Sequence, residues 1–451
     1  MALVHLGCAR NLIDSELILA RLAEEHLMVT PAIEDAEVVV VNTCSFVGEA
    51  RAESYARIEE QLERKRRGDL RAVVVAGCLV ERYRRKLVEQ LPDVDLFCEI
   101  SDYRGLAKQV RGLAKGRKVP AYLEAVERRA GAREGSRLLA TPGSYAYLRI
   151  SHGCDHGCAF CAIPAMRGKH RSKRLPEVAA EAAELLEHGV KELVLVAEDS
   201  TAWGRDLGAG QELPDLVREL ADLDAGDGDH TVRVMYAYPN RFPFALTELM
   251  RDHPRVLPYL DIPIQHAATD VLRGMRRHGS GDQVRKILDR LREEVPGITL
   301  RSTVLLGFPG ETDAHVDELV ELIEHYGLGR LGAFAYSPEE GTPAFGMEAE
   351  VPAKIARERV ERVLAVRDRV LEADQRARVG TVVHALVDEV HPTAEGVRFV
   401  AHGDFDAPEV DPMVLFEHEG FDEPPYAVGD RVRVHVTDVD EDRNLWGDPV
   451  A

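Results

Sequence analysis

Three cysteines near the middle of the chain have a spacing that suits metal chemistry. Cys154, Cys158 and Cys161 lie four and three residues apart, directly after an apolar, strand-like run. Three thiolates at the end of a strand can point at one place, and a 4Fe-4S cluster held by only three thiolates keeps one iron open to a small molecule. Zinc is the alternative for such a set, because His152 or His156 can supply a fourth ligand.

Three further cysteines each follow a short apolar run near the N-terminus. The runs cover residues 4–6, 38–41 and 72–75, and the cysteines are Cys8, Cys44 and Cys78. Continuous apolar runs are typical of strands buried in a parallel sheet, whose carboxyl ends form one ligand-binding edge. Cysteines at three equivalent strand ends therefore favour a second metal or cluster site over simple core packing. Cys98 has no place in this pattern, and we expect it to be packed in the core.

The chain is long enough for two or three domains, and its patterning indicates three. Residues 1–135 alternate apolar strands with helix-like stretches at 11–22 and 49–67, which predicts an open parallel α/β sheet. Residues 114–143 are polar and rich in Arg, Gly and Glu, which is typical of a connector.

Residues 140–372 show six further strand-like runs separated by helical patterns. The runs are 145–150, 192–197, 232–238, 259–263, 299–307 and 331–337. Six β/α units predict a parallel partial barrel, (β/α)6, with its active site at the carboxyl ends of the strands. Helical patterns are expected at 177–188, 270–277, 282–294 and 312–326.

The last part of the chain changes character after a long charged helix expected at 353–376. Residues 376–451 contain short runs of alternating polarity, which predict a small antiparallel β-barrel of the OB-like kind. From Thr381 to the end there are 17 acidic residues and four arginines without a lysine, so this segment carries −13 of the chain's net charge of −21. Such a surface repels RNA and attracts a basic protein.

The central cysteine motif, with Phe160 just before its last cysteine, resembles that of the radical S-adenosylmethionine (SAM) enzymes. The resemblance implies a 4Fe-4S cluster on Cys154, Cys158 and Cys161, with SAM chelated to the open iron. One electron from the cluster then breaks a C–S bond and yields a 5′-deoxyadenosyl radical, so the cofactors supply the chemistry and the protein supplies orientation.

A domain with three cysteines before such a core resembles the methylthiotransferase family. The motifs are Gly7-Cys8-Ala9-Arg10-Asn11, Asn42-Thr43-Cys44 and Gly77-Cys78-Leu79. The resemblance implies that Cys8, Cys44 and Cys78 hold an auxiliary 4Fe-4S cluster that handles the sulfur to be inserted. It also implies that the C-terminal barrel is a TRAM domain.

Three segments are similar to the ribosomal-protein branch of this family, the RimO-type enzymes. They are Phe405–Asp411, Val196–Asp206 and Tyr336–Pro343. This resemblance, with the acidic barrel, implies that a methylthio group is added to the β-carbon of an aspartate in small-subunit ribosomal protein number twelve. A transfer-RNA adenosine methylthiotransferase is the alternative enzyme. A non-catalytic iron–sulfur sensor or binding protein is the alternative of another class.

The resemblance also implies which residues contact SAM. They are Phe160, Glu198, Gln265 and Gly307, and no catalytic residue is assigned beyond the cluster ligands. Simple packing or capping explains Gln265 and His266 equally well, and a turn alone explains Gly307. The basic run 167–174 can bind substrate or the SAM carboxylate, although a solvated face is the commoner role of such a run.

The sequence also bears on partners and compartment. It has no run of about 18 apolar residues and no signal-peptide pattern, so we expect a cytoplasmic protein without a membrane span. Its seven cysteines suit reduced metal ligands better than a disulfide framework. The resemblance implies a flavodoxin- or ferredoxin-type electron donor and a sulfur donor, and the net charge opposes a direct grip on nucleic acid.

Overall fold

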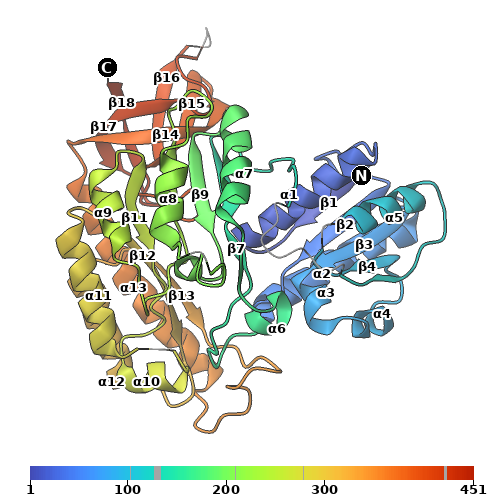
Figure 1. Ribbon diagram of the computed structural model, residues 1–451, viewed down its shortest axis with the longest axis horizontal. Coiled ribbons are helices and arrows are strands. Elements are labelled where there is room, and N and C mark those ends of the chain that lie inside the picture. The colour runs from blue at the N-terminus through green and yellow to red at the C-terminus, as the bar shows by residue number, and fades with distance from the viewer. Residues whose placement is uncertain (102, 126–133, 209, 278, 421–423, 451) are drawn as a thin grey trace. The chain divides into compact units, whose positions relative to one another are not determined.

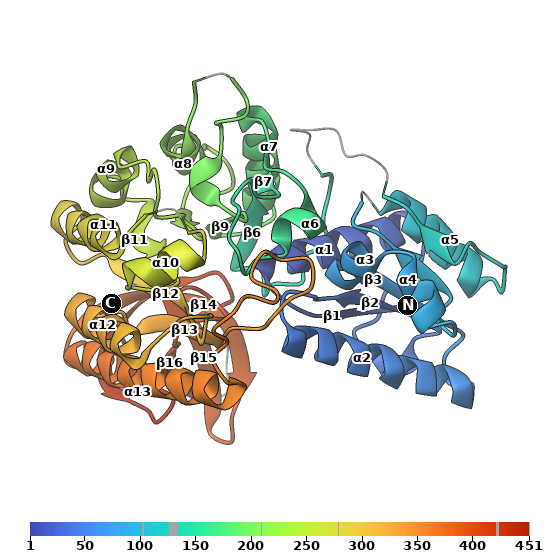
Figure 2. The ribbon, with the colours of Figure 1, turned by 90° about the horizontal axis from the view of Figure 1, so that it is seen from below.

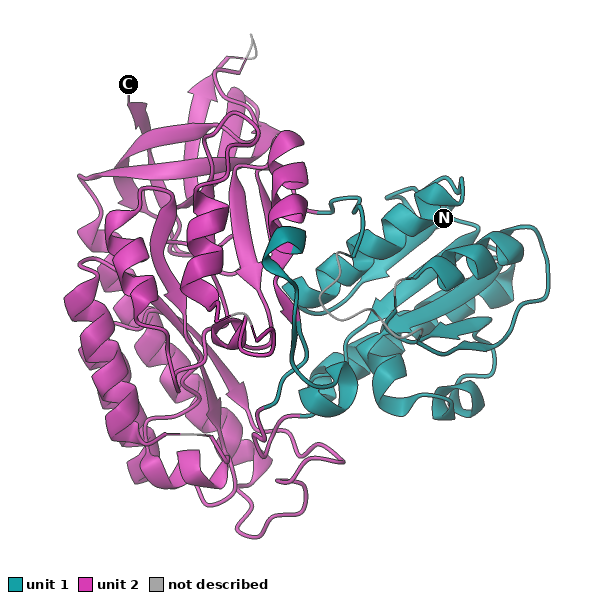
Figure 3. Ribbon diagram, viewed as in Figure 1, with its two compact units in different colours: residues 1–140, 152–155, 162–177 teal, residues 141–151, 156–161, 178–451 magenta. Residues whose placement is uncertain are grey.

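The structure is a computed structural model that describes all residues except 102, 126–133, 209, 278, 421–423 and 451. The chain forms two compact units, each made of discontinuous segments (Figure 3). Unit 1 consists of residues 1–140, 152–155 and 162–177, and unit 2 of residues 141–151, 156–161 and 178–451. No helix among the described residues is long and apolar enough to cross a membrane.

Unit 1 is built on a five-stranded parallel sheet. In sheet order the strands are β1 (Ala2–His5), β2 (Val38–Thr43), β3 (Ala72–Gly77), β4 (Leu96–Cys98) and β5 (Tyr122–Leu123). The main helices are α1 (Ala9–Glu24), α2 (Gly48–Arg67), α3 (Cys78–Tyr83), α4 (Lys86–Gln90) and α5 (Arg104–Ala114). Helix α2 covers one face of the sheet, and α1 and α5 cover the other (Figure 2). The predicted parallel α/β sheet is confirmed, with β4 and β5 as additional short strands.

Both faces of this sheet are apolar because a parallel sheet with helices on each side has no solvated face. The side chains of Val39 and Val41 in β2 pack on the side of the sheet that α2 covers. There they form one buried cluster with Ile58 and Leu62 of α2. The intervening Val40 is equally buried, on the side of α1 and α5. The run of four valines is therefore a central strand, as its continuous apolar pattern indicates.

The expected connector at 114–143 is not a free linker throughout. Part of it falls on residues 126–133, which lie outside the described residues. Tyr122–Leu123 forms the edge strand β5, and the segment after residue 133 is tied to α1. The Leu138 amide donates to the Glu16 carbonyl at 3.2 Å, and buried Arg137 pairs with the Glu16 carboxylate at 3.1 Å. The buried Glu16 carboxylate of α1 thus needs Arg137, a residue of this polar stretch, to balance its charge.

Unit 2 contains an open six-stranded parallel sheet. In sheet order the strands are β13 (Arg330–Ala335), β12 (Thr299–Leu306), β11 (Val256–Asp261), β10 (Thr231–Val234), β9 (Glu192–Val196) and β6 (Tyr145–Arg149). All six predicted strands are present, and every pair is parallel. This arrangement confirms the predicted partial (β/α)6 barrel. Strand β10 is shorter than the predicted 232–238, because the backbone turns into the left-handed region at Tyr236 with φ of 59°.

Helices cover the outside of this sheet. They are α7 (Leu175–Glu187), α8 (Leu213–Ala221), α9 (Ala245–Asp252), α10 (Thr269–Gly274), α11 (Gly281–Glu294), α12 (Asp313–Tyr326) and α13 (Ala353–Ala377). The segment between β6 and α7 carries β7 (Ser151–His152), α6 (Ile163–Arg167) and β8 (Arg171–Ser172). Helices α7, α10, α11 and α12 begin within two residues of the starts predicted from the sequence. Helices α8 and α9 were not predicted. Asp199 is the N-cap of a short helical turn, Ser200–Ala202, and its side chain accepts a hydrogen bond from the Thr201 amide.

The C-terminal strands close into a small barrel, as predicted. Its order is β14 (Val382–Pro392), β15 (Gly396–Gly403), β16 (Val414–Glu419), β18 (Leu445–Val450) and β17 (Arg431–Val439). Strand β18 was not expected from the sequence, and it closes the barrel by pairing parallel to β16 and antiparallel to β17. The interior is filled by alternate residues of each strand, including stacked Phe399 and Phe416.

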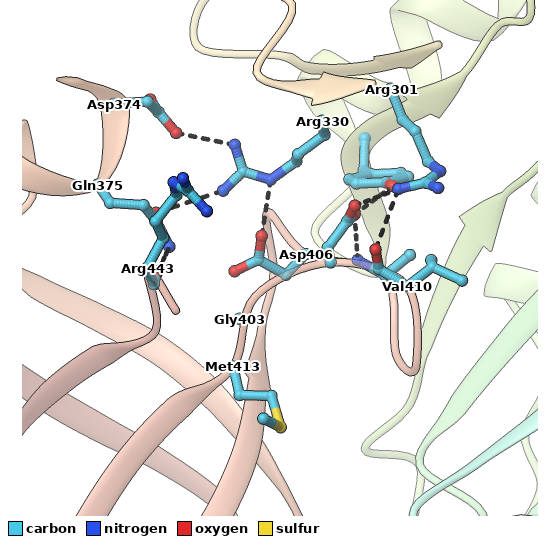
Figure 4. Close-up of polar contacts among 12 residues, drawn as sticks. Arg301, Arg330, Asp374, Gln375, Gly403, Asp406, Val410, Met413 and Arg443 are labelled. Carbon is cyan, nitrogen blue, oxygen red and sulfur yellow. Dashed lines mark hydrogen bonds and ion pairs between the residues drawn. The ribbon is translucent and has the colours of Figure 1, made fainter. Parts of the chain in front are cut away.

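The barrel is fixed to the amino-terminal half of the six-stranded sheet (Figure 1). Arg330, the first residue of β13, donates to the buried Asp406 carboxylate at 2.6 Å (Figure 4). Arg301 of β12 pairs with Asp411, whose other oxygen accepts from the Tyr259 hydroxyl at 2.5 Å. These carboxylates belong to the 405–411 segment, so in this structure the segment joins the barrel to the core.

Candidate functional site

The three cysteines of unit 1 follow neighbouring strands. Cys44 and Cys78 come directly after β2 and β3, and Cys8 comes three residues after the end of β1, the strand beside β2 in the sheet. Cys8 is the N-cap of α1 and Cys78 is the first residue of α3. The sequence prediction that three equivalent strand ends are neighbours is therefore correct. Their polar strand-to-helix turns face solvent to different degrees, Cys8 most and the other two partly.

Side chains of the cysteine motifs hold these three turns together. Asn11 donates to the Leu6 carbonyl at 2.6 Å and to the Thr43 carbonyl at 3.3 Å, joining the ends of β1 and β2. Thr43 in turn donates through its hydroxyl to the Ala76 carbonyl at 2.6 Å, joining β2 to β3. Gly77 has φ of 93°, and a Cβ there would lie 2.4 Å from Asn42 Oδ1. The Asn, Thr and Gly of the motifs are thus required to position the turns.

The thiols are close enough to affect one another. Cys44 Sγ lies against the backbone of Gly7, where an added Cβ would be 3.2 Å from the sulfur. Burial, together with the neighbouring Cys78 and Cys8 thiols, raises the pKa of Cys44 to about 11. A thiol with such a pKa binds a metal only if the metal itself stabilises the thiolate.

Basic residues surround the same thiols. Arg167 donates to Cys78 Sγ at 3.4 Å and to the buried Asp14 carboxylate at 2.7 Å. Burial raises the pKa of Cys78, and Arg167 acts against that rise. For Cys8 the effect of desolvation is outweighed by the charges of Arg10 and Arg167, so its pKa is lowered. Sequence reasoning did not assign Arg167 to this set, since nothing in a basic run shows which thiol it meets.

The basic run 167–174 is not simply a solvated face. The side chains of Arg167 and Lys173 are only 5% and 3% exposed, and Lys173 pairs with Glu134 at 2.8 Å. His170 is also buried and contacts the Ser172 hydroxyl at 3.0 Å. Arg167 and Lys173 thus have buried partners inside unit 1, so the solvated-face interpretation is wrong for these two, whereas Arg174 is 61% exposed.

Cys154 belongs to unit 1, whereas Cys158 and Cys161 belong to unit 2. The Cys154 amide donates to the Gly168 carbonyl at 3.1 Å. Gly153 beside it has φ of 74°, and a Cβ there would lie 2.2 Å from the Lys169 carbonyl oxygen. The glycine is therefore needed for the close approach of these two backbone segments.

In unit 2 the loop of Cys158 and Cys161 is anchored by its backbone. The Ala159 amide donates to the Met275 carbonyl at 2.7 Å, and the Ala159 carbonyl accepts from Ala344 at 2.8 Å. Phe160 is half-buried against an apolar cluster that includes Met275 and Phe308. The aromatic residue of the motif therefore packs the loop onto the carboxyl side of the sheet, and its predicted contact with SAM stays a prediction.

A stacked array lies against Cys158. The Tyr238 ring is stacked on the His156 ring, and the two centroids are 3.7 Å apart. The Arg277 guanidinium also lies over the Tyr238 ring, 4.2 Å from its centroid. Arg277 also donates to Cys158 Sγ at 3.9 Å. His156 Nε2 is 2.7 Å from the Asp199 carboxylate, and this contact helps to lower the pKa of Asp199 against the effect of burial. Tyr238, Arg277 and Asp199 were not predicted, and only the carboxyl-end position of Asp199 gave a signal.

The two histidines considered as zinc ligands have other partners. His152 Nε2 is 2.8 Å from the Glu134 carboxylate, and His156 Nε2 is held by Asp199. Within the described parts of the chain, no three His, Cys, Asp or Glu side chains are gathered tightly enough for a single metal ion. The zinc alternative and the cluster ligands both stay predictions.

The residues expected to contact SAM lie at the carboxyl ends of the strands. Glu198 follows β9, and its buried Oε2 has no hydrogen-bond partner among the residues that the structure describes. Gln265 has φ of 70° and forms an isolated bridge with Val304 of β12. An unsatisfied carboxylate oxygen and a strained backbone are both typical of a ligand site.

Gly307 has a packing role of its own. Its φ is 77°, and a Cβ there would lie 2.3 Å from the Ala356 Cβ of α13. Its amide donates to Glu311 Oε1 at 2.8 Å, and Glu311 is also paired with Arg359 at 2.9 Å. Buried His266 faces Glu311 at 3.4 Å and accepts two backbone amides through Nδ1. The turn and the helix contact therefore account for Gly307 without a ligand.

Known protein families match three consecutive parts of the chain. A model described as uncharacterized protein family UPF0004 matches residues 1–99. The radical SAM superfamily matches residues 148–323, and the TRAM domain matches residues 379–450.

Curated relatives are similar over nearly the whole length. Proteins called ribosomal protein uS12 methylthiotransferase RimO are 36% identical in Desulforamulus reducens, over 97% of this chain and 96% of the relative, and 40% identical in Anaeromyxobacter sp., over 97% and 90%. The protein of that name from Geotalea uraniireducens is 37% identical over 100% of this chain and 98% of its own.

Solved structures support the fold. The radical SAM methyltransferase TsrM from Kitasatospora setae, with cobalamin and a 4Fe-4S cluster bound, has a TM-score of 0.53 and 17% identity, covering 76% of both chains. The cobalamin-dependent radical SAM enzyme OxsB, with aqua-cobalamin and SAM bound, has a TM-score of 0.52 and 14% identity over 80% of this chain and 56% of its own. At this identity the likeness concerns the fold alone.

Proposed function

We propose, from the premise that this chain belongs to the RimO family of ribosomal protein methylthiotransferases, that it adds a methylthio group to the β-carbon of an aspartate in ribosomal protein uS12. The observation that carries the proposal is 36–40% identity to proteins of that name over 97% or more of this chain. The chain is a radical-SAM methylthiotransferase. What we propose is the atom that it modifies, the β-carbon of the aspartate. It acts where ribosomes are, in the cytoplasm, on free uS12 or on the small subunit.

Six cysteines would hold two clusters. On the spacing of the motifs, Cys154, Cys158 and Cys161 would hold the cluster that binds SAM, and Cys8, Cys44 and Cys78 would hold an auxiliary cluster. When bound, the first cluster and SAM supply a 5′-deoxyadenosyl radical, which can remove a hydrogen atom from a carbon that no side-chain base could deprotonate. When bound, the auxiliary cluster supplies an iron site for the incoming sulfur.

The protein's own residues hold the auxiliary site in a fixed form. Asn11 and Thr43 join the three turns, so that the cysteines are placed by sheet geometry instead of flexible loops. Arg167 and Arg10 bring positive charge to Cys78 and Cys8 and favour their thiolates. Replacement of any of these three cysteines should abolish methylthiolation, since each vacant position removes one of only three protein ligands.

At the proposed SAM site, the protein's residues would orient SAM and balance the charges of the thiolate ligand and of the SAM amino group. Arg277 donates to Cys158 Sγ while it is held on the Tyr238 ring, so it places positive charge beside a thiolate ligand. Glu198 presents a carboxylate oxygen without a partner, which suits the amino group of SAM. The apolar cluster behind Phe160 excludes water from one side of the loop.

The cluster count can be measured directly. Chemically reconstituted protein should contain about eight irons per chain, which is the sum for two 4Fe-4S clusters. The triple variants Cys8→Ala/Cys44→Ala/Cys78→Ala and Cys154→Ala/Cys158→Ala/Cys161→Ala should each contain about four. Zinc at stoichiometric amounts in place of iron would contradict the assignment.

Mass spectrometry tests the substrate. Reduced, reconstituted enzyme is incubated anaerobically with sulfide, SAM and either uS12 or a transfer RNA that carries a modified adenosine beside its anticodon. We expect one methylthio group on an aspartate of uS12 and none on the RNA. A gain on the RNA alone would show that the substrate proposal is wrong.

A further inference from the structure

A basic pocket lies beside helices α10 and α11 in unit 2. It has a volume of about 710 Å³, and its charged lining residues are Arg273, Arg276, Arg277, Lys286 and a single carboxylate, Asp282. Four cations against one carboxylate are unusual in a chain whose net charge is −21. The pocket is therefore a local site of attraction for an acidic partner.

The outer cations of this pocket are available to a partner. Arg276 and Lys286 are exposed, and no ion pair to either occurs in the described part of the chain. Arg273 pairs with Asp270 at 2.7 Å, but both side chains are 74% exposed. An ion pair so open to solvent is weak and can be exchanged for a partner's carboxylate.

The inner wall of the pocket is continuous with the cysteine loop. Arg277 lines the pocket and also donates to Cys158 Sγ at 3.9 Å, while its guanidinium rests on Tyr238. Two residues before it, the Met275 carbonyl accepts from the Ala159 amide at 2.7 Å. One short segment thus connects a basic surface directly to a predicted ligand of the SAM-binding cluster.

We infer that this pocket is the docking surface for an acidic one-electron carrier of the flavodoxin or ferredoxin type, which reduces the cluster held by Cys158. In this step the carrier loses one electron and the cluster gains it, and no bond is made or broken in the protein. The inference rests on the proposed function, because it needs Cys158 to be a cluster ligand. It adds the place at which the electron enters.

The surroundings favour an acidic protein over RNA as the occupant. A nucleic-acid groove needs a stripe of cations that follows the phosphates. Along α11, Arg290 and Arg292 also follow Lys286, but Asp289, Glu293 and Glu294 alternate with them and Arg290 is paired with Glu294, so the helix carries mixed charges instead of a continuous basic stripe. A compact basic pocket matches instead the patch of carboxylates that surrounds the cofactor of a small redox protein.

Charge reversal tests the inference. The variant Arg273→Glu/Arg276→Glu/Lys286→Glu is compared with Lys115→Glu/Arg117→Glu/Lys118→Glu, which makes the same change of net charge on exposed residues of unit 1. Formation of 5′-deoxyadenosine is measured at increasing concentrations of reduced flavodoxin, of reduced ferredoxin and, separately, of dithionite. Dithionite needs no protein docking surface, so it reports whether the cluster and SAM site are intact.

With either carrier, we expect the pocket variant to lose roughly tenfold or more in rate at sub-saturating concentration, in line with the effect of charge steering. Its rate with dithionite should equal that of the wild type, and the control variant should match the wild type with all reductants. The wild-type rate with the carrier should fall as salt is raised, and this dependence should be weaker in the pocket variant. The single variant Lys286→Glu should show a smaller loss of the same kind.

Three results would overturn the inference. If the pocket variant loses as much rate with dithionite as with the carrier, the pocket residues serve SAM binding or cluster assembly and not the docking of the carrier. An unchanged rate with the carrier, combined with weaker binding of the pocket variant to small ribosomal subunits, would assign the pocket to RNA. Equal losses in the pocket and control variants would show a general charge effect. Absence of 5′-deoxyadenosine with dithionite in the wild type would instead contradict the proposed function itself.

Discussion

The two ends of the six-stranded sheet in unit 2 are built on opposite principles. At the amino end, the ion pairs of Arg330 with Asp406 and of Arg301 with Asp411 join buried groups of opposite charge between sheet and barrel. At the carboxyl end, Glu198 keeps a buried oxygen that has no partner within the described part of the chain, and Gln265 has a backbone of positive φ. Asp406 Oδ2 at the amino end is a second buried oxygen without a partner among the described residues, but Asp406 is held there by the Arg330 cation. No cation is paired with Glu198 in the described part of the chain, and we expect a ligand to complete that end.

This difference changes how the acidic barrel should be interpreted. Some of its carboxylates are neutralised by the core, since Arg330 binds Asp406 and Arg301 binds Asp411. Glu409 likewise accepts from the hydroxyls of Tyr145 and Tyr147 at 2.8 and 3.0 Å. The 405–411 segment thus has a structural use at this end of the sheet. The charge available to attract a basic substrate comes from other, exposed barrel carboxylates, which include Glu395, Glu419, Asp438, Glu441, Asp442 and Asp448.

The largest expected effect is at the carboxyl end. Cys158→Ala should lower 5′-deoxyadenosine formation by more than about 10³-fold, because it removes one of three thiolate ligands. Its thermal unfolding midpoint as apoprotein should be close to that of the wild type. The matched variant is Cys98→Ala, which changes a buried cysteine outside both sets and should retain activity. Full activity of Cys158→Ala would remove this residue from the mechanism.

At the amino end, the same kind of test should affect stability instead of chemistry. Arg330→Met leaves the buried Asp406 carboxylate without its cation, which costs about 3–5 kcal/mol of unfolding free energy. The double variant Arg330→Met/Asp406→Leu should recover most of this loss, because an apolar pair can replace a buried ion pair. Urea unfolding of the three proteins gives the free energies. A loss below about 1 kcal/mol in the single variant would mean that the ion pair does not hold the barrel.

The amino end should also be sensitive to pH. Burial disfavours the imidazolium of His402, but Glu192 and Asp388 outweigh it and raise its pKa to about 9. A raised pKa means that the stabilising charge is fully present below about pH 6.5 and is lost as the pH rises through about 9. His402→Gln should therefore be less stable than the wild type at pH 6.5 by about 1–3 kcal/mol, and the gap should close by pH 10. A gap that stays the same from pH 6.5 to pH 10 would contradict this role of His402.

The smallest effect is expected for the unpaired oxygen at the carboxyl end. Glu198→Gln should weaken SAM binding by up to about tenfold, because a neutral amide accepts a weaker hydrogen bond from an ammonium group than a carboxylate does. Its unfolding free energy should not fall, since no partner is lost. Isothermal titration of reconstituted protein with SAM gives the affinity, and the exposed Glu187→Gln serves as the charge control. Tighter SAM binding by the variant would contradict this role for Glu198.

The sequence predicted the sheets well, because their strands are continuous valine-rich or leucine-rich runs whose length and spacing are sufficient signals. It did not predict β5 or β18, since Tyr122–Leu123 is too short for a pattern and Leu445–Val450 contains Gly447 and Pro449. Of the site, strand ends and motif spacing indicated that Cys8, Cys44 and Cys78 follow neighbouring strands, and the assignment of the six cysteines as cluster ligands stays a prediction. Arg277 and Tyr238 could not be predicted, because they meet Cys158 only through tertiary structure.

Transfer of deuterium tests the central claim most directly. Ribosomal protein uS12 is prepared with deuterium on the β-carbons of its aspartates and incubated anaerobically with reduced, reconstituted enzyme, sulfide and SAM. If the radical abstracts hydrogen from the aspartate β-carbon, the 5′-deoxyadenosine formed carries one deuterium and the same aspartate gains a methylthio group. Undeuterated 5′-deoxyadenosine together with unmodified uS12 would contradict the account, and would show that this radical enzyme acts on another substrate.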